Sequence, residues 1–151
     1  MIIAVGADHY GFELKEILKE QLTALGHDVR DHGCHSTDEV DYPDIAVRVA
    51  EEVAAGGAER AVLICGTGIG MAIAACKVPG VRAAAVADPY SAERAQKSNN
   101  AQVLCLGAKI VSPENATLLL GHWLDSEFQG GASARKVAKI DALDALVPAS
   151  V

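Results

Sequence analysis

The sequence lacks the features that would place it in a membrane, outside the cell or on a nucleic acid. No apolar segment approaches about 18 residues, the length that crosses a bilayer. The first residues have neither the basic start nor the cleavage site of a signal peptide. Acidic residues outnumber Lys and Arg by 20 to 13, whereas nucleic-acid binding needs concentrated basic charge. We therefore expect a cytoplasmic protein with no membrane or nucleic-acid partner.

The sequence also lacks paired cysteine spacings and any repeat or linker. Its thiols are expected to be free, because no secretory signal accompanies them. His32, Cys34 and His35 do not have the spacing of the usual zinc pairs, so we expect no metal ion. With 151 residues, 50% of them hydrophobic, the chain can bury a core without disulfides, and we expect residues 1–151 to form one domain. The cysteines are Cys34, Cys65, Cys76 and Cys105.

Short apolar runs alternate with segments of helical periodicity. Strands are expected at 2–5, 27–31, 61–65, 82–87 and 102–106, and helices at 12–25, 43–55, 69–77, 89–97 and 113–125. Parallel neighbours need a crossover connection between them. The pattern therefore predicts an α/β fold with a doubly wound, five-stranded parallel sheet.

A final amphipathic helix is expected at about 133–147, after the Gly130–Gly131 pair. Its apolar stripe comprises Val137, Ile140, Leu143, Leu146 and Val147. Such a helix after a glycine hinge can pack on its own core or on a second subunit.

The stretch ICGTGIG, residues 64–70, ends the most apolar expected strand. Ligands of doubly wound sheets bind beyond the carboxyl ends of strands, which is where Cys65 lies. The N–H groups of the following helix start can bind an anion or a developing oxyanion and favour a thiolate. Cys65 is a candidate base or nucleophile, or else a small buried hydrophobe. The loop residues are Gly66, Thr67, Gly68, Ile69 and Gly70.

Nucleotide binding is the first chemistry to test against this loop. Met71 stands where the third glycine of a dinucleotide fingerprint belongs, and the Gly-Lys-Ser/Thr of a P-loop is absent. Asp88 follows Gly68 by about 20 residues, the spacing of a ribose-binding acid, so a nucleotide-binding module remains an alternative interpretation. Acid–base chemistry on a small sugar is the other interpretation.

The first expected strand ends in GADHYG, residues 6–11. Asp8 and His9 are thereby expected at the same sheet edge as Cys65, where such a pair can bind hydroxyls and exchange protons. Either residue can equally serve as the N-cap of the next helix.

Together these segments resemble the ribose/galactose sugar-phosphate isomerase family. The resemblance spans nearly the whole chain, in the segments 6–15, 41–43, 64–70, 88–92, 98–100, 106–107 and 130–131. It implies a three-layer α/β/α domain of Rossmann-like type, and homodimers or dimers of dimers with shared active sites. It also implies aldose–ketose isomerisation of the ribose 5-phosphate/ribulose 5-phosphate type, without metal or cofactor.

The resemblance implies a role for each matching residue. Cys65 would remove the proton beside the carbonyl, giving a cis-enediolate whose oxygens the loop amides hold while Thr67 relays a proton. Asp8, His9 and Asn99 match substrate-binding positions, with Asn99 supplied by a partner subunit.

The chain departs from the family at its ring-opening and phosphate-binding positions. Ser98 replaces the ring-opening histidine, and serine is no comparable general acid. Ala132 and Lys136 replace two arginines of the phosphate clamp, with Arg135 one residue out of register. Lys109 holds a further basic position. Lysine gives charge without the bidentate fork of arginine.

These departures favour two alternative functions. An active site that keeps the base but lacks the ring-opening residue suits an open-chain substrate. Erythrose or erythrulose 4-phosphate is such a substrate, because its O4 is esterified and cannot close a furanose ring. The second alternative is a non-catalytic partner subunit of a hetero-oligomeric isomerase, which Ser98 and Ala132 suit and the retained Cys65 does not.

Overall fold

Strands and helices alternate along the chain. The structure is a computed structural model and describes residues 1–146. The elements are β1 (Ile2–Ala7), α1 (Phe12–Ala24), β2 (Asp28–Asp31), α2 (Tyr42–Ala54), β3 (Arg60–Cys65), α3 (Ile69–Ala75), β4 (Ala83–Ala85), α4 (Pro89–Lys97), β5 (Val103–Gly107), α5 (Pro113–Leu124), α6 (Ala132–Ala142) and a 3-10 helix, η1 (Leu143–Leu146). Among these residues, no helix combines the length and the apolar character that a membrane crossing requires.

The five strands form one parallel sheet in the order β2-β1-β3-β5-β4. The register pairs Val5 with Val62 and Val62 with Leu104, so β3 lies at the centre. The chain passes from β1 to β2 on one side and returns to β3 on the other. The carboxyl ends of β1 and β3 therefore flank the topological switch point, where α/β sheets bind ligands.

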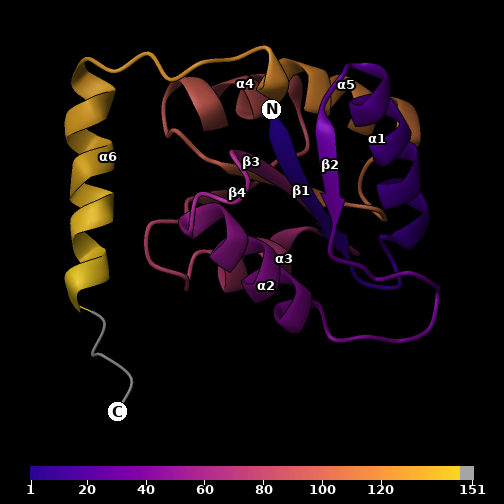
Figure 1. Cartoon of the computed structure of the whole chain (residues 1–151). Coiled ribbons are helices and arrows are strands. Elements are labelled where there is room, and N and C mark those ends of the chain that lie inside the picture. Colours follow the sequence, from indigo (N-terminus) through magenta and orange to yellow (C-terminus); the bar gives the residue numbers. More distant parts are fainter. Residues whose placement is uncertain (147–151) are drawn as a thin grey trace.

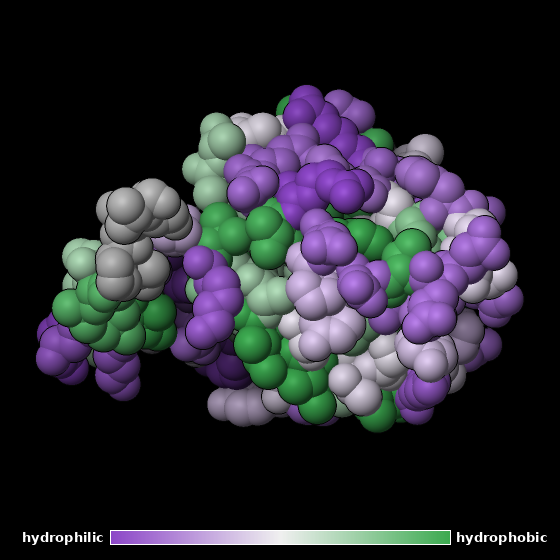
Figure 2. Space-filling view, turned by 90° about the horizontal axis from the view of Figure 1, so that it is seen from below, coloured by the Kyte–Doolittle hydropathy of each residue, from purple (hydrophilic) through white to green (hydrophobic). Residues whose placement is uncertain are grey.

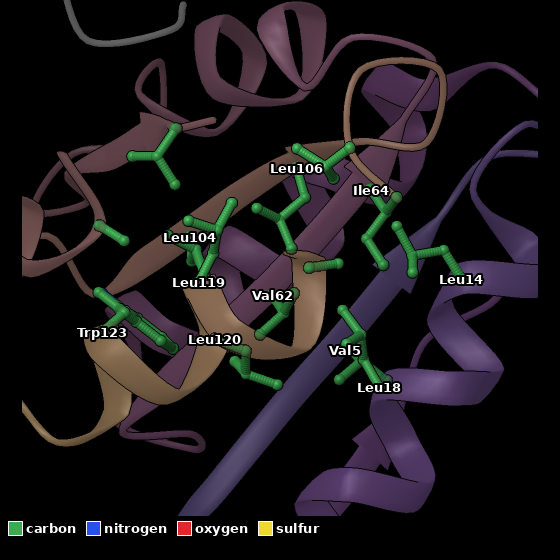
Figure 3. Close-up of a cluster of buried hydrophobic side chains, with 14 of the residues drawn as sticks. Val5, Leu14, Leu18, Val62, Ile64, Leu104, Leu106, Leu119, Leu120 and Trp123 are labelled. Carbon is green, nitrogen blue, oxygen red and sulfur yellow. The ribbon is translucent and has the colours of Figure 1, made fainter. Parts of the chain in front are cut away.

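Apolar side chains cover both faces of the sheet, which is typical of parallel sheets. On one face, Val5, Val62 and Leu104 pack against α1, α4 and α5, with Trp123 fully buried among them (Figure 3). On the other face α2 and α3 cover a second cluster that includes Leu63. The three-layer α/β/α prediction is confirmed (Figure 1).

Most predicted boundaries agree with the structure to within two residues. The exception is the final helix, expected at about 133–147: α6 ends at Ala142, and residues 143–146 form the 3-10 helix η1 instead.

Among the strands, β4 differs most. It covers Ala83–Ala85 instead of residues 82–87. The Arg82 N–H donates to the side-chain Oε1 of Gln102 at 2.8 Å instead of to a backbone carbonyl, so regular strand pairing begins only at Ala83. Beyond the strand, Asp88 accepts from Ser91 N–H at 2.8 Å and caps α4. The interpretation of Asp88 as a ribose ligand is therefore replaced by a capping role.

The C-terminal helix α6 stands at the side of the body (Figure 1). It is attached by an ion pair between Arg82 and Asp141, with Nη1 and Oδ1 2.7 Å apart. Of the predicted apolar stripe Val137 is buried, whereas Ile140, Leu143 and Leu146 are 43, 58 and 76% exposed. Val147 lies outside the described residues.

A buried ion pair joins α1 to the end of β2. The ammonium of Lys15, which is 0% exposed, lies 2.6 Å from Oδ2 of Asp31, and Lys19 approaches the same oxygen at 2.6 Å. Oδ1 accepts the N–H of Gly33 at 2.9 Å. Burial alone would raise the pKa of Asp31, but these hydrogen bonds outweigh it and lower that pKa to about 2.

We expect Asp31 to make the fold sensitive to acid. Because its pKa is lowered from 3.8 to about 2 on folding, its stabilisation is present above the unfolded value and is lost as the pH falls towards 2. The loss is on the order of 2 kcal/mol. Urea unfolding between pH 5 and 2.5 should show a shallower pH dependence in Asp31→Asn than in the wild type. Asp28→Asn, at an exposed position of β2, is the control, and equal slopes in all three proteins would contradict this role.

Candidate active site

The ends of β1 and β3 form one wall of an open cavity. Ala7 pairs with Ile64 in the sheet, and the Asp8 N–H donates to the Ile64 carbonyl at 3.1 Å. The cavity has a volume of about 450 Å³. Figure 2 views the molecule from the side to which the strands point, where apolar and polar surface intermingle. The cavity is lined by Asp8, Tyr10, Tyr42, Cys65, Gly66, Thr67, Ile69, Gly70, Ile73 and Lys109.

Cys65 lies at the base of this cavity and is 4% exposed. Its Sγ accepts the backbone N–H of Gly68 at 3.2 Å. An amide at the start of α3 thus points at the sulfur. The residue also packs in the second apolar cluster, so it is a buried side chain as well as a group that faces the cavity.

The other cysteines lie outside this cavity. All four are free thiols in the structure, as predicted. Burial raises the pKa of Cys105 well above its ordinary value, and burial also raises the pKa of Cys34. Cys76 is exposed, and its Sγ donates to the carbonyl of Ala83 at 3.4 Å. Cys65 alone among these four lines the cavity at the carboxyl ends of β1 and β3.

Two glycines let the loop after Cys65 lie close to its neighbours. Gly68 has a φ of +79°, and a Cβ there would lie 3.0 Å from the backbone of Leu106. A Cβ on Gly70 would lie 2.7 Å from the hydroxyl oxygen of Tyr42. A larger residue at either position would displace the loop from β5 or from the Tyr42 ring.

The loop amides are only partly available to a ligand. The Gly68 N–H is bonded to Cys65, and the Ile69 N–H donates to Oγ1 of Thr67 at 3.3 Å. Within residues 1–146, the N–H groups of Gly66, Thr67 and Gly70 donate to no other protein group. The expectation that the whole loop binds an oxyanion is therefore narrowed to these free amides.

Asp8 and His9 follow β1 but lie in different surroundings. Asp8 is 4% exposed and lines the cavity, and its Oδ1 accepts the N–H groups of Tyr10 at 3.0 Å and Gly11 at 3.2 Å. His9 does not line the cavity. Its Nδ1 accepts the N–H of Val40 at 3.2 Å, so the neutral ring carries its proton on Nε2.

Lys109 is the predicted phosphate-binding cation that lies at the cavity. Its backbone N–H donates to the Gly66 carbonyl at 3.0 Å. Its ammonium lies 3.9 Å from the centre of the Tyr10 ring. The sequence interpretation omitted Tyr10 and Ile73 from the site, although Tyr10 directly follows the Asp-His pair at a strand end.

The remaining predicted site residues lie elsewhere in the chain. Ser98 ends α4, and Asn99 follows it before the start of β5. Ser98 and Asn99 thus lie near the amino end of β5, whereas Cys65 pairs with Gly107 at its carboxyl end. The two ends of β5 are four residue steps apart, which is roughly 13 Å. Arg135 and Lys136 are exposed on α6. A single chain therefore does not bring these four residues to Cys65.

Comparison with known proteins identifies the family. A family model described as Ribose/Galactose Isomerase matches residues 3–140. The chain belongs to this family. The resemblance stated from the sequence motifs is thereby confirmed.

Members of the family are closely similar in sequence and in structure. The D-erythrulose-4-phosphate isomerase of Pectobacterium atrosepticum is 50% identical over 139 residues, which cover 91% of both chains. The ribose-5-P isomerase B of Listeria innocua is 47% identical over 144 residues, which cover 95% of this chain and 97% of the relative. The ribose-5-phosphate isomerase B structure of Clostridium thermocellum has a TM-score of 0.95 at 42% identity, over 97% of this chain and 99% of that chain.

Proposed function

We propose that this chain interconverts the aldose and ketose forms of a small sugar phosphate, of the ribose 5-phosphate/ribulose 5-phosphate type. The observation that carries this proposal is the Cys65 sulfur, bonded to a loop amide and facing a cavity at the switch point. The thiolate takes a proton from the carbon beside the carbonyl, and the C–H electron pair forms the double bond of a cis-enediolate. The carbonyl electron pair moves onto oxygen, and the Cys65 thiol, whose proton can exchange with solvent in the meantime, then protonates the neighbouring carbon.

The residues around Cys65 suit the other needs of this reaction. The free N–H groups of Gly66, Thr67 and Gly70 are donors for the enediolate oxygens, where such donors contribute most to catalysis. The Thr67 hydroxyl relays a proton between those oxygens. Asp8 binds sugar hydroxyls from the cavity lining, and Lys109 supplies positive charge for the phosphate. His9 does not line the cavity but packs against Tyr10, which does, and it binds a sugar hydroxyl through its Nε2.

We further propose that the active site is completed by a second copy of the chain, in a homodimer or a dimer of dimers. Ser98 and Asn99 lie at the opposite sheet edge from Cys65 of their own chain, and the exposed apolar residues of α6 are unpartnered within residues 1–146. The partner would supply Ser98, Asn99, Arg135 and Lys136. Free thiols are typical of a reducing compartment, so we place the activity in the cytoplasm.

A tetrose 4-phosphate is a second candidate substrate. Ser98 stands where the ring-opening histidine is expected, and a relative named D-erythrulose-4-phosphate isomerase is 50% identical. A tetrose 4-phosphate needs no ring opening.

The ratio of kcat/KM for ribose 5-phosphate to that for D-erythrulose 4-phosphate separates the two candidates. If ring opening limits turnover of the pentose, Ser98→His should raise its kcat/KM by about 10-fold or more and leave that for the tetrose unchanged. Ser98→Ala is the matched control. A clear preference of the wild type for the pentose would reject the tetrose candidate. Absence of any isomerase activity in the purified chain would favour the non-catalytic partner subunit.

A further inference from the structure

Lys109 carries a positive charge without a carboxylate partner. Of the 13 Lys and Arg residues, five form ion pairs within residues 1–146, namely Lys15, Lys19, Arg30, Arg82 and Lys97. Lys109 is one of the eight others, and among those it is the one that lines the Cys65 cavity. The rest of the cavity lining is mostly apolar, so an unpaired cation there is suited to bind an anionic group of a ligand.

The Tyr10 ring holds this cation in place. Its centre lies 3.9 Å from the Lys109 ammonium, well within the range of a cation–π interaction. Tyr10 is itself supported: its backbone N–H is bonded to Asp8, and its ring lies against the His9 ring, with the centroids 4.3 Å apart and the planes tilted by 40°. The flexible lysine stem would otherwise sample many rotamers.

Both side chains converge on Gly66, the residue that follows Cys65. The Lys109 stem lies 3.7 Å, and the Tyr10 ring 3.9 Å, from the position of a Cβ on Gly66. The backbone N–H of Lys109 is also bonded to the Gly66 carbonyl at 3.0 Å. The ammonium is thus tied by its ring partner and its backbone to the loop that carries the catalytic thiol.

We propose that Tyr10 is a positioning residue that holds the Lys109 ammonium beside the loop to bind the phosphate of the substrate. This inference rests on the proposed function in one respect, namely that the phosphate belongs to a sugar. Tyr10 has no part in proton transfer, so it governs binding and not the chemical step.

Substitution of Tyr10 tests this role. Tyr10→Leu should raise KM for the sugar phosphate by about threefold to tenfold, the range set by a cation–π contact, with little change in kcat. The dissociation constant of inorganic phosphate, measured by calorimetry, should rise in parallel. Tyr10→Phe keeps the ring face and should retain wild-type values. Tyr90→Leu, which alters a 72% exposed tyrosine on α4, is the control.

A double-mutant cycle identifies the partner. In a Lys109→Met background, Tyr10→Leu should weaken phosphate binding no further. The proposal is overturned if Tyr10→Leu binds phosphate as the wild type does, if Tyr10→Phe is as weak as Tyr10→Leu, or if both effects add fully. A wild type that binds phosphate through Tyr10 but isomerises no sugar phosphate would support this inference and refute the proposed function.

Discussion

Cys65→Ala is expected to lower kcat for sugar-phosphate isomerisation by about 10²- to 10⁴-fold, the contribution of a positioned general base. The substitution removes the sulfur that accepts the Gly68 N–H and faces the cavity. Alanine cannot accept the proton beside the carbonyl, so the substrate should also stop exchanging that proton with solvent. Deuterium uptake from D₂O, followed by NMR, measures this step without the rest of the reaction.

The control for this prediction is Cys76→Ala. Cys76 is an exposed thiol on the far end of α3 and does not line the Cys65 cavity. It should therefore keep wild-type exchange and turnover. Cys65→Ala is expected to remain folded, because the change removes a single atom from a short side chain. Undiminished deuterium uptake by a folded Cys65→Ala protein would exclude the cysteine as the base.

The sequence predicted the elements of the fold better than their order. Buried strands such as Ala61–Cys65 are continuous apolar runs, and Pro89 and Pro113 mark helix starts, so local signals define them. The insertion of β5 between β3 and β4 has no such signal. It is a matter of contacts between segments far apart in the chain, such as the pairing of Leu63 with Cys105, which side-chain periodicity along the chain does not describe.

The part of the candidate site that lies at the ends of strands could be predicted from the sequence. Asp8 and Cys65 each follow or end a buried strand, and parallel strands bring such residues to one edge. Tyr10 was missed because its role depends on Lys109, about a hundred residues away. The positions of Ser98 and Asn99 relative to Cys65 were expected only from the family resemblance, since no local pattern indicates a second subunit.

Two variants that are inactive alone should recover about a quarter of wild-type activity when they are combined, if each active site uses two subunits. Cys65→Ala removes the base, and Asn99→Ala removes the group expected from the partner. In a mixed dimer, one site carries both defects and the other carries neither. Half of the dimers are mixed in a random assembly, and half of their sites are intact.

This complementation distinguishes a shared site from a site within one chain. Cys65 and Asn99 lie at opposite edges of the same sheet, so an intramolecular site would need the sheet itself to rearrange. Co-expression of two differently tagged chains, followed by tandem purification, isolates the mixed assembly, which should have about half of wild-type kcat per dimer. Purified mixed dimers as inactive as their parents would show that Asn99 does not act across the interface. The roughly 13 Å between the two sheet edges would then mean that Asn99 has no contact with the substrate at Cys65.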